Sequence, residues 1–176
     1  MWRQKKAIGI LFGLLLTLYG SVTAEAGQRP VLGSFSGGFV AGEDTNYDGI
    51  PSAEHTQLVV STVGIFINEV VSEVLPALPV PVTCPANTLE FHFLYNQAAG
   101  THFFTGDQLF GSYTSGTLCL NPATGRFSFK GTGVYTGGTG KFTGASGSFS
   151  ASSNGRLLPD GSGNQTGIVT GTLILP

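Results

Sequence analysis

Short runs rich in β-branched and aromatic residues follow one another along the chain, separated by clusters of turn residues. The clearest run is 88–95, in which every odd-numbered residue is leucine or aromatic and the even-numbered residues are mostly polar. Alternation with a period of two places these two sets on opposite faces of a strand. No segment shows a convincing amphipathic helical pattern, so the sequence predicts an all-β protein.

Further strands are predicted at 31–40, 56–74, 101–104, 109–113, 117–120, 126–135, 143–151 and 165–175. The end of the long run, 68–74, also fits a helical turn, because Val70, Val71 and Val74 have helical spacing. Turns are expected at 96–100, 106–107, 121–125 and 154–163. Residues 76–85 hold four prolines and are predicted to be a loop or edge segment, since proline at this density cannot lie inside a β-ladder.

The runs amount to about eight strands, joined mostly by short hairpins, which together build an antiparallel meander. A meander of eight strands avoids exposed edges by closing into a barrel. A sandwich of two sheets is the alternative, because the number of strands alone does not separate the two folds. The interior of such a barrel holds packed side chains or one small ligand.

Residues 1–26 have the features of a secretory signal peptide. A positively charged start is followed by the apolar run 8–18 and by Ala24-Glu25-Ala26, which fits an A-x-A cleavage site. The apolar run is about half of the roughly 20 residues that span a bilayer, which argues against a membrane anchor. We therefore expect a secreted or periplasmic protein, cleaved near Ala26, with one β-barrel domain at 27–176 and no membrane span.

Charge and cysteine content restrict the possible binding partners and the cellular compartment of the protein. The formal net charge is −2, and the expected signal peptide carries three of the eight basic residues, so the remaining chain is more acidic. A surface this poor in lysine and arginine argues against nucleic acid or anionic lipid as a partner. Cys84 and Cys119 are the only cysteines, and in an exported chain they are expected to form a disulfide.

Glycine is concentrated at 131–148, but Val134, Tyr135 and Phe142 interrupt it, which predicts two strands meeting at a tight corner. Within this stretch, Gly-Gly-Thr-Gly-Lys-Phe-Thr-Gly-Ala-Ser-Gly at 137–147 resembles a motif of the allene oxide cyclase-like barrels, a fold shared with dirigent proteins. Gly-Asp-Gln-Leu-Phe at 106–110 and the segment 115–125 resemble secreted bacterial members of that group. The resemblance covers roughly 84–150.

The resemblance implies an eight-stranded calycin-like barrel, and a trimer is common among the plant relatives. Plant members hold a reactive hydrophobic guest in the barrel and act mainly by steering its conformation. The matched motif is a structural corner and contains none of the family's polar lumen groups, so the resemblance assigns no catalytic residue here. Fold analogy by itself does not establish an activity.

Aromatic side chains are the candidates for lining the barrel lumen. We name Phe91, Phe93, Tyr95, Phe104 and Phe110 as ligand-binding candidates. The competing interpretation is that these rings, together with Phe103, simply fill the interior of a small barrel.

Residues 44–52 fit the first half of a calcium loop. Oxygen ligands are expected from Asp44, Asn46, Asp48, the carbonyl of Ile50 and, through water, Ser52. The loop departs from the EF-hand pattern at its twelfth position, where His55 replaces the bidentate glutamate. A structural calcium ion is one interpretation, and a surface turn rich in Asp and Asn is the other.

Other chemistry has weaker support. His92 and His102 could face each other across a hairpin at 96–100 and, with Glu90, form a metal site, although the spacing is not diagnostic. Glu90, Asp107 and Tyr113 are the acid–base candidates. The sequence has no nucleophile elbow, phosphate loop or metalloprotease helix motif, so no cofactor is expected apart from calcium.

Three functions follow as hypotheses, and catalytic residues remain unknown. The first is an exported barrel that binds a small hydrophobic molecule or has a structural role. The second is a cyclase- or dirigent-like enzyme that needs no cofactor and acts on a hydrophobic substrate. The third is a surface protein stabilised by calcium. A homo-oligomer, trimeric by family analogy, is an additional expectation.

Overall fold

The protein is a closed antiparallel barrel, as the sequence predicts. The computed structural model describes residues 27–44, 49–75 and 82–176, without the side chains of Val74 and 94–96. The strands are β1 (Gly27–Ala41), β2 (Ala53–Ser61), β3 (Gly64–Val74), β4 (Leu89–His102), β5 (Gln108–Leu120), β6 (Arg126–Gly138), β7 (Ser146–Leu157) and β8 (Gly163–Leu175). Each pairs with the next, and β8 pairs with β1, which closes the sheet and excludes the sandwich alternative. The expected signal peptide lies outside the described residues.

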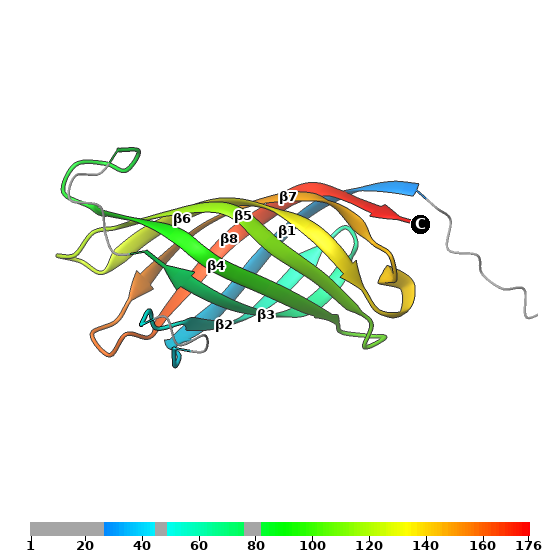
Figure 1. Cartoon of the computed structure of the whole chain (residues 1–176), viewed down its shortest axis with the longest axis horizontal. Coiled ribbons are helices and arrows are strands. Elements are labelled where there is room, and N and C mark those ends of the chain that lie inside the picture. Colours follow the sequence, from blue (N-terminus) through cyan, green and yellow to red (C-terminus); the bar gives the residue numbers. More distant parts are fainter. Residues whose placement is uncertain (1–26, 45–48, 76–81) are drawn as a thin grey trace, which may run out of the picture.

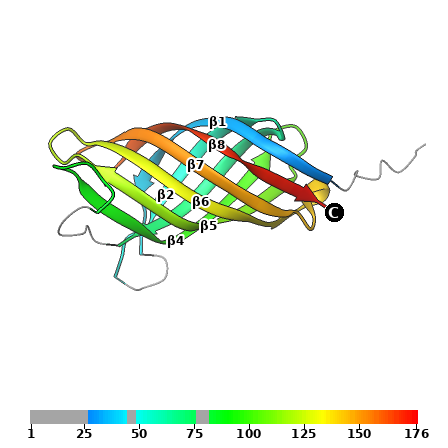
Figure 2. The same cartoon turned by 90° about the horizontal axis from the view of Figure 1, so that it is seen from above.

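The barrel is elongated, and its two ends differ (Figures 1 and 2). One end, here the closed end, carries the C-terminus, the β2–β3 and β4–β5 turns and the β6–β7 connection. The other, here the open end, carries the β1–β2, β3–β4, β5–β6 and β7–β8 connections. No helix among the described residues has the length and apolar character needed to cross a membrane.

Two local predictions are wrong because strand pairing overrides local sequence preference. The segment 68–74, which fits a helical turn, is the second half of β3 and pairs with both β2 and β4. The turn expected at 96–100 lies inside β4, and the chain reverses at 103–107 instead. There the His102 carbonyl accepts from the Gly106 N–H at 2.9 Å, and the His102 N–H donates to the Asp107 carbonyl at 2.8 Å. In a closed sheet both neighbours supply partners, so weakly β-forming residues are held in the ladder.

The inward face changes parity along β4. Phe91 and Phe93 border the lumen in the first half of β4, whereas Ala98 and Gly100 border it in the second half. At the step from Glu73 to Val74 in β3, the paired residue in β4 moves two positions, from Tyr95 to Phe93, so β4 carries one extra residue at this change. A bulge re-aims the side chains that follow it, so alternation read from one end of the strand misassigns the other end.

The glycine-rich stretch forms the β6–β7 connection at the closed end. A single 3₁₀ turn, η1 (Gly140–Phe142), lies between the two strands, and β7 begins at Ser146 rather than at 143. Gly140 has a φ of 54°, and a side chain there would also overlap the Asp107 carboxyl group. Phe142 is only 2 % exposed and packs with Val31 and Leu173, which seals this end of the lumen.

Many of the strand glycines make room for aromatic rings inside the barrel. Four rings lie directly across from a glycine of the neighbouring strand: Phe35 opposite Gly167, Phe39 opposite Gly163, Phe127 opposite Gly155, and Phe149 opposite Gly133. A Cβ atom added at any of these glycines would overlap the opposite ring. Each ring therefore covers bare backbone, which supplies the packing that a glycine in a strand otherwise lacks.

The predicted disulfide is present. Cys84, in the β3–β4 connection, is bonded to Cys119 of β5, with 35 residues separating them in sequence. A crosslink closing a loop of this length stabilises a fold by roughly 3 to 4 kcal/mol in the chain-entropy model.

The ring–glycine packing predicts that Gly133→Ala destabilises the barrel by about 1–3 kcal/mol, the usual cost of overpacking a core. The new methyl group would overlap the Phe149 ring and approach the Ser112 carbonyl oxygen to 2.5 Å. Gly38→Ala is the matched control, because a Cβ there meets only the Gly163 carbonyl oxygen, at 3.3 Å. Urea unfolding of both variants is the measurement, and equal stabilities would contradict the packing argument.

Candidate functional site

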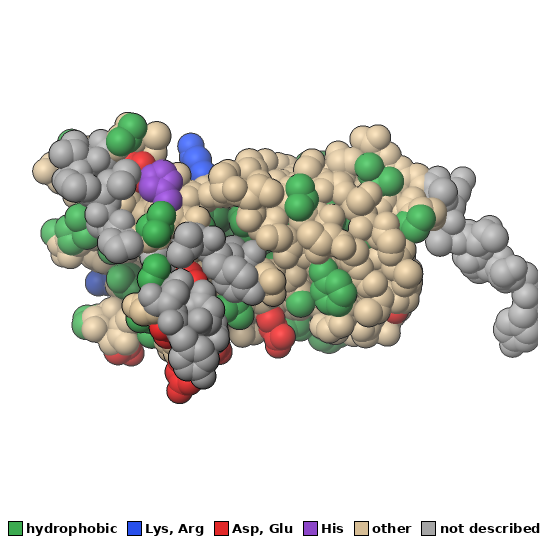
Figure 3. Space-filling view, in the orientation of Figure 1, with side chains coloured by type: hydrophobic (Ala, Val, Ile, Leu, Met, Phe, Trp, Pro, Cys, Tyr) green, Lys and Arg blue, Asp and Glu red, His purple; other side chains and the backbone are tan. Residues whose placement is uncertain are grey.

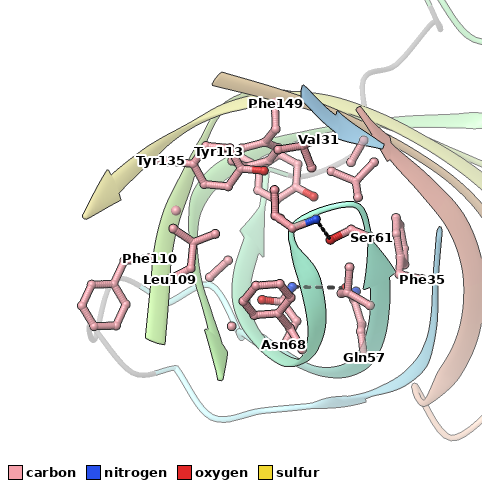
Figure 4. A pocket seen from close by; sticks show the side chains of 18 residues that line it. Val31, Phe35, Gln57, Ser61, Asn68, Leu109, Phe110, Tyr113, Tyr135 and Phe149 are labelled. Atoms are coloured by element: carbon pink, nitrogen blue, oxygen red, sulfur yellow. Dashed lines mark hydrogen bonds between the residues drawn. The ribbon is translucent and has the colours of Figure 1, made fainter. Parts of the chain in front are cut away.

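The lumen contains a cavity of two adjoining chambers. The outer chamber, near the open end, has a volume of about 310 Å³, and the inner chamber has a volume of about 90 Å³. Phe35, Gln57 and Tyr113 line both chambers, so the two lie side by side. Figure 4 shows the side chains around the inner chamber. The cavity stops at the apolar seal of the closed end, where Phe66 and Leu109 join Phe142.

The walls of the outer chamber are mainly apolar. The rings that line it are Phe35, Phe39, Phe91, Phe93, Tyr113, Phe127 and Phe129. Among the described residues lining either chamber there is no lysine, arginine, aspartate or glutamate. Charged side chains instead lie outside the lumen, and Figure 3 shows most of them on that face near the open end. The cavity is therefore suited to an uncharged guest.

A hydrogen-bonded chain of four polar side chains crosses one wall of the outer chamber. The Ser153 hydroxyl donates to Gln165 Oε1 at 2.9 Å, Gln165 Nε2 lies 3.2 Å from His55 Nδ1, and His55 Nε2 lies 2.9 Å from the Ser72 hydroxyl. We call these residues the polar relay.

The relay spans an intervening strand. Gln165 belongs to β8 and His55 to β2, and β1 lies between these strands. The β1 residue directly across from Gln165 is Gly37, where an added Cβ would overlap the backbone of Thr56 in β2. The sequence pattern indicates His55 only as the last position of a calcium loop and does not predict the relay. The alternation of β2, which puts His55, Gln57 and Val59 on one face, is the signal that could have indicated it.

Burial keeps the ionisable lumen side chains neutral. It lowers the pKa of His55 to about 4, so the imidazole is uncharged at neutral pH. Burial also raises the pKa of Tyr113, with a contribution from Tyr135, and raises the pKa of Tyr135 to about 12. Both tyrosine rings pack against Phe149, with centroids 5.0 and 5.2 Å apart. Neither hydroxyl has a hydrogen-bond partner among the described residues.

The five aromatic candidates named from the sequence have different positions. Phe91 and Phe93 line the outer chamber. Phe110 lies at the edge of the inner chamber, with its ring directed away from the other labelled side chains (Figure 4). Phe104 is not in the lumen, because the chain reverses at 103–107 and leaves this ring 73 % exposed. The backbone of Tyr95 pairs with Glu73, and its side chain lies outside the described part.

The expected calcium ligands are only partly within the described residues. Asp44 Oδ2 accepts from the Gly49 N–H at 2.7 Å, whereas Asn46 and Asp48 lie outside the described residues. Ile50 is half-buried. Ser52 is 2 % exposed, and its hydroxyl donates to Glu73 Oε1 at 3.1 Å. No group of three or more His, Cys, Asp or Glu side chains in the described ranges could hold a metal ion.

The expectation that His92 and His102 face each other is wrong. Both belong to β4, and ten residues of strand separate them by roughly 33 Å. His102 is 7 % exposed, and its ring packs edge-on against Phe66. His102 Nδ1 lies 3.1 Å from the Thr105 hydroxyl, which donates to Asp107 Oδ2. Asp107 therefore organises the β4–β5 turn rather than the lumen.

Glu90 organises the β3–β4 connection. Its carboxylate is fully buried, and it accepts from the N–H groups of Val82, Thr83 and Cys84 at 2.8, 2.8 and 3.0 Å. These bonds, above all those with Thr83, lower the pKa of Glu90 to about 2. His92 Nε2 lies 3.0 Å from the same carboxylate. Glu90 also pairs with Cys119 in the ladder, so the carboxylate and the disulfide hold one segment against β4 and β5.

Comparisons with protein-family models, with curated proteins and with solved structures find no match for this chain.

The buried, neutral state of His55 predicts that the free energy of unfolding falls as the pH is lowered from 6.5 to about 4. In this range the unfolded chain takes up a proton at His55 and the folded barrel does not, so protonation favours unfolding. The shift in pKa corresponds to about 3 kcal/mol. His102, whose pKa burial also lowers, contributes in the same direction.

Urea unfolding across this pH range, with and without His55→Gln, measures the effect. Glutamine keeps an amide in the relay but does not titrate, so the variant should have a shallower pH dependence. An unchanged dependence would contradict a neutral, buried His55.

Proposed function

We propose that this protein binds a small, uncharged, mainly apolar molecule in its lumen, which enters at the open end. The outer chamber carries this proposal. Its volume of about 310 Å³ lies at the lower end of the usual range for small-molecule sites, roughly 300–1,000 Å³. Aromatic walls with a few convergent polar groups are also typical of such sites.

We further propose membership of the allene oxide cyclase-like barrels. The closed eight-stranded barrel is the fold that the resemblance implies, and the motif at 137–147 forms the connection around η1. Export through the N-terminal signal peptide belongs to the same proposal, and the Cys84–Cys119 disulfide is compatible with an oxidising compartment. A homo-oligomer is a proposal that rests on the family analogy alone.

The alternative function is a cyclase- or dirigent-like enzyme that needs no cofactor. The observation that favours it is the presence of neutral hydrogen-bonding groups, His55, Ser72 and Tyr113, on the wall of an otherwise apolar chamber. Such groups can hold a reactive guest in one conformation. Native mass spectrometry of protein purified from its own host separates the two functions, because a binder retains one unchanged ligand whereas an enzyme co-purifies with product or with nothing.

Lumen binding predicts that Ala53→Trp weakens the binding of an uncharged apolar dye, N-phenylnaphthylamine, by about tenfold or more, a change of at least 1.4 kcal/mol. Ala53 lines the outer chamber, so an indole there occupies the space of the guest. Thr56→Trp is the matched control, because Thr56 is exposed on the outside of the same strand. Fluorescence titration is the measurement, and equal binding by both variants would exclude the lumen as the site.

Calcium binding at 44–52 remains a separate prediction of the ligand pattern. If it holds, calcium raises the melting temperature and EDTA lowers it, by an amount equivalent to about 2.7 kcal/mol at a hundredfold excess over Kd. Asp44→Asn should remove the response, because it keeps the acceptor for the Gly49 N–H but loses the charge. A melting temperature that EDTA does not move would contradict this prediction.

A further inference from the structure

The hydrogen bonds of the polar relay have a single consistent direction. Ser153 donates to Gln165 Oε1, so the amide oxygen faces Ser153 and the amide nitrogen faces His55. An amide NH₂ group only donates, which makes His55 Nδ1 an acceptor without a proton. The neutral imidazole must then carry its proton on Nε2, and this N–H donates to the Ser72 oxygen at 2.9 Å.

This direction leaves the Ser72 hydroxyl with a proton to donate. Ser72 lines the outer chamber and is 3 % exposed, and its bond from His55 uses the oxygen as the acceptor. The hydroxyl proton has no acceptor among the described residues. A buried donor without a partner loses its hydrogen bond to water and gains none in return, and a guest that supplies an acceptor removes this penalty.

The charge of the chamber restricts the kind of acceptor. The described lining has no cation to pair with a carboxylate or phosphate, and Glu73 lies directly behind the wall, bonded to Ser52. An anion in the chamber would therefore be desolvated without compensation. Tyr113, at the junction of the two chambers, adds a second neutral hydroxyl.

We propose that the outer chamber selects apolar molecules with an uncharged hydrogen-bond acceptor, such as a carbonyl oxygen, which binds the Ser72 hydroxyl. This inference rests on the proposed lumen binding and adds the chemical class of the guest. His55 and Gln165 act as positioning residues, because they fix the direction of the Ser72 hydroxyl without touching the guest's acceptor.

The first test is the position of the proton on His55, which does not require a ligand. Nitrogen NMR of protein with labelled histidine distinguishes the two neutral forms, and His55→Gln assigns the signal. We expect the proton on Nε2. In Gln165→Glu, studied at a pH at which His55 is neutral, the carboxylate should accept from Nδ1 and move the proton there. A proton on Nδ1 in the unmodified protein would overturn the inference.

The second test compares two probes of the same shape. Acetylnaphthalene carries a ketone, and isopropenylnaphthalene has a carbon–carbon double bond in its place. By calorimetric titration, the unmodified protein should bind the ketone about tenfold or more tightly than the alkene, as expected for a buried donor that the alkene leaves unpaired. Ser72→Ala and Gln165→Glu should each remove this preference, so that the ketone and the alkene bind to each variant with similar affinity.

The outcomes separate the two proposals. Equal affinity of the unmodified protein for both probes would overturn the selection of an acceptor and leave lumen binding intact. Failure of both probes to bind would contradict lumen binding, and the selection of an acceptor with it. A preference for naphthoate, the carboxylate of the same ring system, would show that the chamber takes anions and would also overturn the inference.

Discussion

The packing of aromatic rings over glycines inside the barrel is the interaction on which the rest of the structure depends. Eight strands enclose little space, and an interior filled with rings on every strand would not close. Phe35 over Gly167 and Phe149 over Gly133 solve this problem, because a ring takes the volume that the opposite residue gives up. This need explains several of the chain's 27 glycines, among them Gly133 and Gly167.

The same packing makes the two ends of the lumen different. At the closed end, Phe142 enters from the β6–β7 connection and completes an apolar core with Val31 and Leu173. The open end has no corresponding insertion among the described residues, and the chamber remains between rings that line its walls. The wall of this chamber carries the polar relay, in which Gln165 of β8 reaches His55 of β2 past Gly37 of the intervening strand β1.

The relay also shows why the site is harder to predict than the fold. Its members come from β2, β3, β7 and β8, and His55 and Gln165 are 110 residues apart in the sequence. No local motif connects them, and each alone is an ordinary polar residue in a strand. The candidates suggested by local sequence, Phe104 and the pair His92 and His102, depended on a turn at 96–100. These predictions are wrong because β4 continues to His102 and the turn lies further along the chain.

The sequence by itself determined the all-β class, most strand positions and the disulfide, because each follows from short-range alternation, turn residues or the number of cysteines. Closure into a barrel instead of a two-sheet sandwich is a property of the tertiary structure, in which β8 pairs with β1. Only the tertiary structure decided where β4 ends, which face of it borders the lumen, and which polar side chains meet there. These features depend on hydrogen bonds from neighbouring strands and on a bulge in β4, opposite Glu73 and Val74 of β3, that reverses the alternation. Such long-range pairing is set by closure of the barrel, and local residue preferences do not encode it.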